Sequence, residues 1–124
     1  MTDEFFLALD GDDVGRRLEL CMLTNDLEAL REFSSSFDSA MRALVQSACS
    51  IDGVELVLFG GDSVMLRVRS DVLQEVLSLA RRTTGRFTFS GGYAPSMREA
   101  YLALKLAKSS GKDRIEGPLS SAGR

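Results

Sequence analysis

The chain has 124 residues, an apolar fraction of 44% and a formal charge of −3 at pH 7. This length and composition are typical of one globular domain with its own core, and the slight acidic excess excludes a strongly basic surface for stable nucleic-acid binding. The chain contains no histidine, which excludes catalytic triads and zinc sites built on imidazole.

The first half of the chain predicts a strand, a short helix and a long helix. Residues 4–9 are apolar at successive positions, which is typical of a strand covered on both faces. A short helix is expected over residues 14–23. Apolar residues then recur at helical spacing over residues 27–49, and we expect Asn25 to cap this long helix with Glu28 as its capping-box partner.

The second half predicts a β-hairpin followed by a helix, a strand and a last helix. Two β-rich runs, residues 54–59 and 64–69, flank a pair of glycines that can adopt the positive φ of a tight turn. The remaining expected elements are a helix from about Ser70, a strand over residues 86–92, a helix capped by Ser96 and Glu99 that ends near Gly111, and a short strand near residues 114–116.

This order of elements predicts an α+β fold, a ferredoxin-like antiparallel sheet with helices packed on one face, formed by residues 1–116. Residues 117–124 are small and polar, and we expect a flexible tail. Right-handed crossovers would place the first two strands parallel, with the third antiparallel between them. The end of the first strand then lies beside the start of the third, which brings Asp10 and Asp62 to one edge of the sheet.

Acidic residues at these two strand ends suggest a divalent-metal site. Mg²⁺ prefers hard oxygen ligands and commonly takes one or two carboxylates, a need that Asp10, Asp62 and the backbone carbonyl of Gly11 would meet. Asp12 or Asp13 could supply another ligand, although either could instead cap the following helix. The alternative is that all these acids belong to caps and turns, and the convergence of the two strand ends favours the metal.

Glycines and lysines near these acids suggest a nucleotide-binding site. Gly60 and Gly61 lack Cβ atoms, so the backbone there can approach a bound nucleotide closely. Lys108 and Lys112 lie four residues apart at the end of the last helix and are candidates for binding a triphosphate. The alternative is that these lysines form, with Lys105, a solvated helix face whose positive charges complement the negative end of the helix dipole at the C-terminus.

The sequence shows no membrane-spanning run and no signal-peptide pattern, so we expect a cytoplasmic protein without membrane contact. Cys21 and Cys49 lie in segments of helical periodicity, and we interpret them as reduced core or interface residues.

Four segments, taken in order, resemble the palm domain of the nucleotidyl cyclase superfamily. The superfamily includes the GGDEF diguanylate cyclases and the polymerase palms of type III CRISPR effectors, and the chain is most similar to the minimal CRISPR polymerases (mCpol), stand-alone palms of about this length. The segments are Leu9-Asp10-Gly11-Asp12, Gly60-Gly61-Asp62, Ser90-Gly91-Gly92 and Ala107-Lys108-Ser109-Ser110-Gly111-Lys112-Asp113-Arg114.

The resemblance implies a metal-dependent nucleotidyltransferase that condenses nucleoside triphosphates into a cyclic di- or oligonucleotide signal, in antiphage defence. ATP is the expected substrate, with GTP as a possible one. The resemblance also implies Mg²⁺ or Mn²⁺ on Asp10, Gly11 and Asp62, and a triphosphate on Lys108 and Lys112. A ribose hydroxyl would attack an α-phosphate with help from the metal. Because one palm holds one site and the product joins two nucleotides, we expect a homodimer with facing sites.

The chain departs from the CRISPR palm pattern at Ser63, where a second acid is usual, so a second metal ion would have to rely on Asp12 or Asp13. It also lacks the Asp-x-Asp-Asn-Phe-Lys segment of diguanylate cyclases, so guanine selection by that route is not expected. Two alternatives stay open. One is a hydrolase similar to archaeal GTP cyclohydrolase III, and the other is a non-catalytic nucleotide-binding module, for which Ser63 is the best argument.

Overall fold

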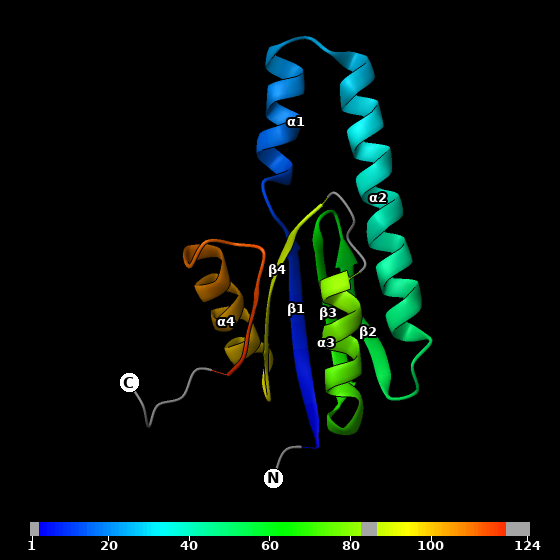
Figure 1. The fold of residues 1–124 in the computed structure, drawn as a ribbon, viewed down its shortest axis with the longest axis vertical. Helices are drawn as coiled ribbons and strands as arrows, with labels where there is room; N and C mark the ends of the chain where they lie inside the picture. The colour runs from blue at the N-terminus through cyan, green and yellow to red at the C-terminus, as the bar shows by residue number, and fades with distance from the viewer. Residues whose placement is uncertain (1–2, 83–86, 119–124) are drawn as a thin grey trace.

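The central strand of the fold is β1 (Glu4–Gly11) in this computed structural model, which describes residues 3–82 and 87–118. β1 pairs antiparallel with β3 (Ser63–Arg69) on one side and with β4 (Phe89–Ala94) on the other (Figure 1). Successive side chains of β1 point to opposite faces of the sheet. The apolar run that predicted a doubly covered strand therefore supplies both faces with core residues.

Two outer strands complete the sheet in the order β2-β3-β1-β4-β5. β2 (Val54–Gly60) pairs antiparallel with β3, so β1 and β2 run parallel, as the crossover argument predicted. β5 (Ile115–Glu116) pairs parallel with β4. The sheet is therefore mixed rather than wholly antiparallel, because a helix connects β4 to β5 and a strand–helix–strand crossover returns the chain in the same direction.

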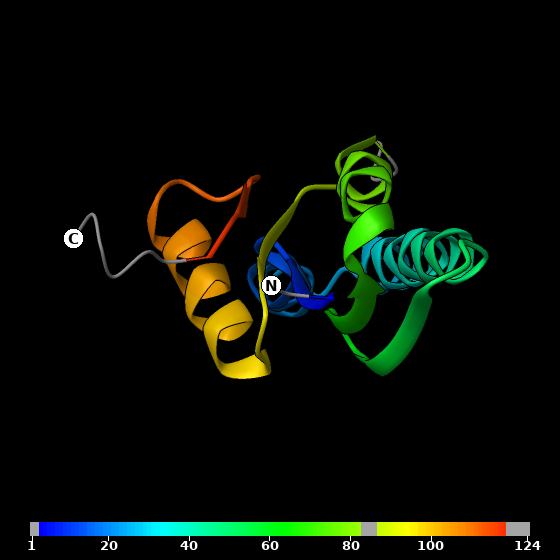
Figure 2. The same ribbon diagram turned by 90° about the horizontal axis from the view of Figure 1, so that it is seen from below.

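The helices cover both faces of the sheet. α2 (Leu27–Cys49) and α3 (Leu73–Arg82), which follows the short 3₁₀ turn η1 (Ser70–Val72), pack on the face that carries Leu9. Residues of α4 form a separate apolar cluster with Ala8, on the opposite face (Figure 2). The α+β class with a ferredoxin-like core is confirmed, and the expected packing on one face holds only for α2 and α3.

The last helix, α4 (Met97–Ser109), lies directly on β4 because Gly92 has no side chain. A Cβ at Gly92 would overlap the backbone of Ala100 and Leu104. Ser96 caps the helix as predicted, accepting a hydrogen bond from the Glu99 backbone N–H. This close contact holds the C-terminal end of α4 beside the end of β1.

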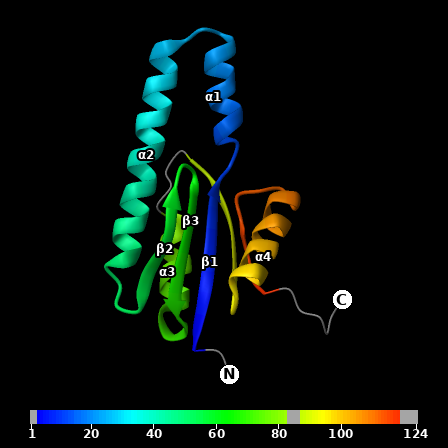
Figure 3. The ribbon, with the colours of Figure 1, turned by 180° about the vertical axis from the view of Figure 1, so that it is seen from behind.

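A helical hairpin of α1 (Val14–Leu23) and α2 rises beyond the end of the sheet where β1 ends (Figures 1 and 3). The predicted cap at Asn25 is wrong, because Asn25 turns the chain between the helices in a left-handed conformation with φ of 54°. The neighbouring Asp26 is the cap, and its carboxylate accepts a hydrogen bond from the Ala29 backbone N–H at 3.0 Å.

Gly61 has φ of 59° and forms the predicted turn of the β2–β3 hairpin. The expected start of the fourth strand, residue 86, lies outside the described residues, as do residues 119–124 of the expected tail. Cys21 is half-buried and Cys49 is exposed, so Cys49 is not a core residue, and both are free thiols. Over the described ranges, none of the helices combines the length and apolar character needed to cross a bilayer.

Gly92→Ala should lower the free energy of unfolding by about 3 kcal/mol, because the added methyl group forces α4 away from β4. Chemical denaturation measures the effect. Gly15→Ala is the matched control, because a Cβ at this position of α1 meets nothing within 4 Å. Equal stability of Gly92→Ala and the parent would contradict the direct contact of α4 with the sheet.

Candidate nucleotide and metal site

The candidate site lies where the end of β1 meets the start of β3. Asp10 is paired with Ser63 across the two strands, and the Ser63 hydroxyl donates a hydrogen bond to Asp10 Oδ1 at 2.8 Å. The Gly11 backbone N–H donates to the Asp62 carbonyl at 2.9 Å. The structure thus brings Asp10, Gly11 and Asp62 to one sheet edge, next to the glycine turn of the hairpin.

Lys108 reaches this edge from α4, on the far face of the sheet. Its ammonium contacts the Gly11 carbonyl at 2.9 Å, Asp12 Oδ1 at 3.0 Å and Asp10 Oδ2 at 3.2 Å. Burial alone would lower the pKa of Lys108, but the hydrogen bonds and charges of Asp12 and Asp10 outweigh it, and the pKa is raised. Lys108 therefore belongs to the site, whereas Lys105 lies over the Tyr101 ring, 5.5 Å from its centroid.

Asp12 anchors three parts of the chain and has little capacity left for a metal. Its side chain is 2% exposed. Besides Lys108, it accepts hydrogen bonds from the hydroxyls of Thr88 and Ser90, both at 2.7 Å, and from the Asp113 backbone N–H at 2.9 Å. Burial raises the pKa of Asp12, but the hydrogen bonds from Ser90, Thr88, Lys108 and Asp113 lower it more, and the net pKa is below its usual value.

Asp13 and Lys112 form a second acid–base contact beside the first. Lys112 Nζ lies 2.6 Å from Asp13 Oδ1, and this hydrogen bond is the main reason why the pKa of Asp13 is lowered. Asp13 precedes α1 in a left-handed conformation with φ of 60°, and its side chain makes no capping hydrogen bond. Neither of the two candidate acids therefore acts as a side-chain cap for α1.

The donor atoms at the edge suit one hard cation. Burial, and then the negative charge of Asp10, raise the pKa of Asp62, so a positive charge between the two carboxylates would relieve their repulsion. The Lys108 ammonium already lies on Asp10 and on the Gly11 carbonyl, which shows that these oxygens accept a cation. Among the residues that the structure describes, no cluster of three or more Asp, Glu, Cys or His side chains is placed to hold a metal. Two carboxylates and a carbonyl are nevertheless sufficient for Mg²⁺ with water and phosphate as further ligands.

A cavity of about 320 Å³ adjoins the edge, between the helical hairpin and the β2–β3 turn. Its volume is in the range of small-molecule sites. Apolar and aromatic side chains form most of its wall, and Ser34 and Asp38 provide polar groups. The full lining is Val14, Gly15, Leu18, Phe33, Ser34, Phe37, Asp38, Gly61 and Asp62. Because Gly61 and Asp62 line it, the cavity is continuous with the candidate metal site.

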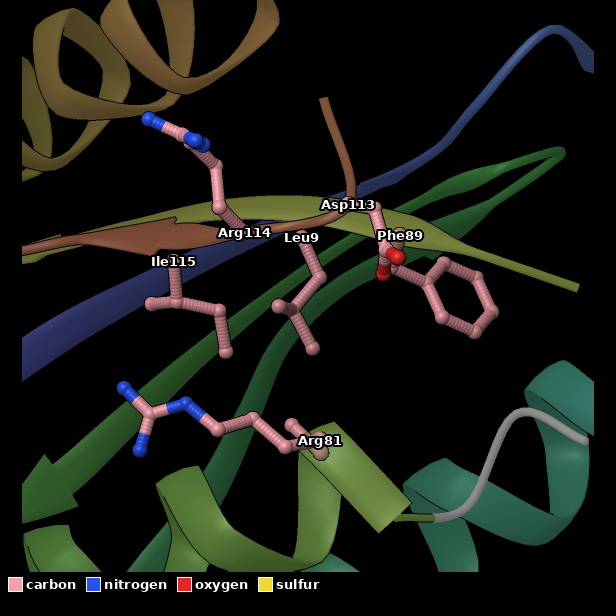
Figure 4. A pocket seen from close by; sticks show the side chains of 7 residues that line it. Leu9, Arg81, Phe89, Asp113, Arg114 and Ile115 are labelled. Carbon is pink, nitrogen blue, oxygen red and sulfur yellow. The ribbon is translucent and has the colours of Figure 1, made fainter. Parts of the chain in front are cut away.

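A second cavity, of about 370 Å³, lies between α3 and the β4–β5 edge of the sheet (Figure 4). Leu9 and Ile115 point into it from the sheet, and Arg81 borders it from α3. None of the predicted site residues lines this cavity. Asp113 lines this cavity and also contacts the site, because its backbone N–H donates a hydrogen bond to Asp12.

Sequence reasoning missed Thr88, Ser90 and Asp113 as parts of the site. Ser90 is fully buried, and it lies within a strand whose polar and aromatic residues alternate in the sequence. That alternation was a signal that one face of β4 carries polar groups. The sequence could not show that Asp12 binds these polar groups, because the residues that donate to Asp12 lie 76 to 101 positions away from it in the chain.

The model of the minimal CRISPR polymerase domain (mCpol) matches residues 6–117 of the chain. No curated protein gives a significant match. The chain is similar in structure to the active GGEEF domain of a diguanylate cyclase from Vibrio cholerae, with a TM-score of 0.64 and 16% identity over 97% of this chain and 85% of that one.

Two further solved structures share the fold. The coiled coil and GGDEF domain of DgcB from Caulobacter crescentus, in complex with c-di-GMP, has a TM-score of 0.66 and 16% identity over 94% of this chain and 70% of that chain. A Csm1–Csm4 cassette in complex with one ATP has a TM-score of 0.69 and 19% identity over 91% of this chain, which spans only 20% of the matched chain. At these identities the similarity establishes a shared palm-type fold.

Asp12→Asn should lower the free energy of unfolding at neutral pH by about 3 kcal/mol, because it removes a buried charge from Lys108 and leaves hydrogen-bond donors unpaired. Chemical denaturation measures this loss, with the exposed Asp13→Asn as the control that should change little.

The difference between parent and Asp12→Asn should also depend on pH. Because the folded pKa of Asp12 is lowered, its stabilising effect is complete above the unfolded value near 3.9 and disappears as the pH falls through the folded pKa. The difference in stability between the two proteins should therefore begin to shrink below about pH 4 and disappear once the pH is below the lowered folded pKa of Asp12. A constant difference down to pH 2 would contradict the role of the ionised carboxylate.

Proposed function

Because the chain belongs to the minimal CRISPR polymerase domain family, we propose that it is a metal-dependent nucleotidyltransferase that condenses nucleoside triphosphates into a cyclic di- or oligonucleotide. The observation that carries the proposal is the meeting of Asp10, Gly11, Asp62 and Lys108 at one sheet edge, beside a cavity of nucleotide size. Carboxylate oxygens, a carbonyl and an ammonium are the groups that phosphoryl transfer uses.

The proposed metal ligands are Asp10, the Gly11 carbonyl and Asp62. The proposed cofactor is Mg²⁺ or Mn²⁺. The ion, when bound, supplies positive charge that polarises the α-phosphate and the attacking hydroxyl. Ser63 holds Asp10 Oδ1 through its hydroxyl, and Asp10 Oδ2, which now contacts the Lys108 ammonium at 3.2 Å, is the oxygen proposed for the ion. Asp12 is fully engaged with protein donors, so we propose one strong metal site rather than two.

Lys108 and Lys112 are the proposed triphosphate ligands. Lys108 has three N–H donors, and two of them now bind Asp10 and Gly11, the oxygens assigned to the metal. In the loaded site these two N–H groups become free for phosphate oxygens, while the third remains on Asp12. The Lys112 side chain is more exposed than that of Lys108, and it needs only to break its contact with Asp13 to bind a phosphate oxygen. Gly60 and Gly61 have open space around them, so the hairpin turn can lie against the ribose and phosphates.

The cavity between α1, α2 and the hairpin turn is the proposed base site. The Leu18 side chain and the edge of Phe33, whose ring lies under the Arg17 guanidinium, provide apolar surface for a base. The Ser34 hydroxyl and Asp38 Oδ1 can accept hydrogen bonds from an exocyclic amino group, while Asp38 Oδ2 accepts one from Arg42. Adenine carries such a group. ATP is the proposed substrate on this ground and because a Csm1–Csm4 cassette of the same fold was solved with ATP.

In the proposed reaction, a ribose hydroxyl oxygen of one nucleotide forms a bond to the α-phosphorus of another. The bond from that phosphorus to the pyrophosphate oxygen breaks, and the hydroxyl proton passes to solvent. Lys108 and Lys112 stabilise the negative charge that develops on the departing pyrophosphate. Each chain offers one site, so we propose that two chains face each other as a homodimer. A role in antiphage signalling is proposed from the family alone.

The proposed function predicts that the purified protein converts ATP with Mg²⁺ or Mn²⁺ into a cyclic product and pyrophosphate, detected by mass spectrometry after incubation with each of the four triphosphates. Asp10→Asn and Asp62→Asn should each lower kcat by a factor of about 100 or more, because a neutral amide binds a hard cation poorly. Asp52→Asn, at an exposed acid on another part of the surface, is the matched control.

The product distinguishes the alternatives. Ring-opened guanine product from GTP alone would favour a hydrolase similar to GTP cyclohydrolase III. Nucleotide binding without consumption of any triphosphate would favour the non-catalytic module, for which the hydroxyl at Ser63 in place of an acid remains the best argument. Full activity of Asp62→Asn would indicate that other residues bind the metal.

Lys112→Ala should raise KM for the triphosphate about tenfold and leave the melting temperature nearly unchanged, because the side chain is 40% exposed and its ion pair with Asp13 is solvated. Lys108→Ala should lower both activity and stability, since its ammonium also holds the buried Asp12. Steady-state kinetics and thermal melts check both variants. Identical behaviour of the two variants would contradict these separate roles.

A further inference from the structure

The cavity between α3 and the β4–β5 edge lies on the face of the sheet that carries Leu9 (Figure 4). α2 and α3 pack over β2 and β3, and the same face continues onto β4 and β5 (Figure 2). α3 ends at Arg82, and the cavity of about 370 Å³ occupies the space beside its last turn. This volume is in the range of small-molecule sites. None of the residues proposed for the metal, the triphosphate or the base is among those that line it.

The floor of this cavity is apolar. Leu9, Gly91 and Ile115 are register partners across β1, β4 and β5. Because Gly91 has no side chain, its two neighbours close over it, and a Cβ there would lie 2.6 Å from Leu9 Cδ2 and 3.2 Å from Ile115 Cγ1. Phe89 and Ala80 are buried and complete the apolar wall. The floor therefore suits the apolar body of a ligand rather than its charged groups.

Two charged side chains of the lining have no partner in the part of the chain that the structure describes. Neither the Arg81 guanidinium nor the Asp113 carboxylate makes an ion pair or a hydrogen bond there, and both residues are exposed. Arg114, the third charged residue of the lining, already lies 3.5 Å from Glu116. Figure 4 shows Arg81 and Asp113 on opposite sides of the apolar floor. The cavity therefore offers one positive and one negative group, set apart from each other.

These two groups define the ligand by its charges. A guanidinium forms two parallel hydrogen bonds with a carboxylate, and the carboxylate of Asp113 attracts an ammonium and repels a second anionic group. We propose that the cavity binds a small zwitterion whose apolar body, of about the size of one aromatic ring, lies on Leu9 and Ile115. Its carboxylate lies on Arg81 and its ammonium on Asp113.

The zwitterion site and the candidate nucleotide site share one contact. The Asp113 backbone N–H donates to Asp12 at 2.9 Å, and Asp12 in turn contacts Lys108 at 3.0 Å. A ligand on the Asp113 carboxylate should therefore shift the amide resonance of Asp113, which gives the test a local reporter. Asp113 has a left-handed φ of 50°, a conformation that Asn also adopts, so the carboxylate can be removed without a change of backbone.

Two-dimensional amide NMR of the isotope-labelled protein tests the site, with para-aminomethylbenzoate as the probe and no triphosphate present. Saturable shifts are expected at Arg81, Asp113 and Ile115, with a dissociation constant of about 1 mM. Benzoate and benzylamine each lack one of the two charged groups. Each should bind about fivefold more weakly than the zwitterion.

Two variants assign the charged ends. Arg81→Gln should weaken binding of the zwitterion about fivefold and leave benzylamine unchanged, since benzylamine has no carboxylate. Asp113→Asn should weaken binding of the zwitterion by about the same factor and should not weaken benzoate, which has no ammonium. Arg82→Gln is the matched control, because Arg82 is the exposed neighbour in α3 that does not line the cavity. Thermal melts verify that each variant is folded.

Three results overturn the zwitterion site. They are absence of saturable shifts up to about 10 mM probe, shifts centred on Asp10 and Lys108, and equal affinity of the parent and Arg81→Gln. In the last case Arg81 serves only to complement the negative end of α3. Because the titration contains no triphosphate, its failure leaves the proposed function untouched. A protein that binds the zwitterion but consumes no triphosphate supports the site and overturns the proposed function.

Discussion

The arrangement of the site depends on the buried carboxylate of Asp12. Its two oxygens receive hydrogen bonds from Thr88 and Ser90 on the β4 side, from Lys108 at the end of α4, and from the backbone of Asp113 beyond α4. These contacts join the end of β1 to elements far away in the sequence. A buried carboxylate is stable only when it is fully paired, so the folded chain must keep α4 and the segment after it against the sheet edge. Lys108 thereby stays beside Asp10, and Lys112 beside Asp13.

The charges at this edge support the proposal that it binds a metal ion and a triphosphate together. Four carboxylates meet two ammonium groups within the site, namely Asp10, Asp12, Asp13 and Asp62 against Lys108 and Lys112. The excess of negative charge favours a divalent cation. The lysines in turn favour phosphate oxygens once the cation has taken their carboxylate partners, so that metal and nucleotide each make the site better for the other.

The sequence was sufficient to predict the order of the elements along the chain and the arrangement of the first three strands, because hydrophobic periodicity located the elements and crossover handedness fixed the directions of those strands. It also placed Asp10 beside Asp62, since that pairing follows from the topology alone. It could not place α4 on the second face, because the apolar side of a helix does not identify the sheet face it meets. The small residues Gly92, Ala100 and Ala103 were the available signal of close contact. The sequence likewise could not predict that Asp12 anchors the site, because the hydrogen-bond partners of Asp12 come together only in the complete fold.

The most direct test of the account is a crystal structure with Mn²⁺ and a non-hydrolysable ATP analogue, using the anomalous signal of manganese to locate the ion. Manganese is expected at about 2.1 Å from oxygens of Asp10, Gly11 and Asp62, with phosphates on Lys108 and Lys112 and adenine in the cavity lined by Phe33 and Asp38. Manganese bound to Asp12, or a nucleotide in the cavity between α3 and the β4–β5 edge of the sheet, would contradict the proposed site.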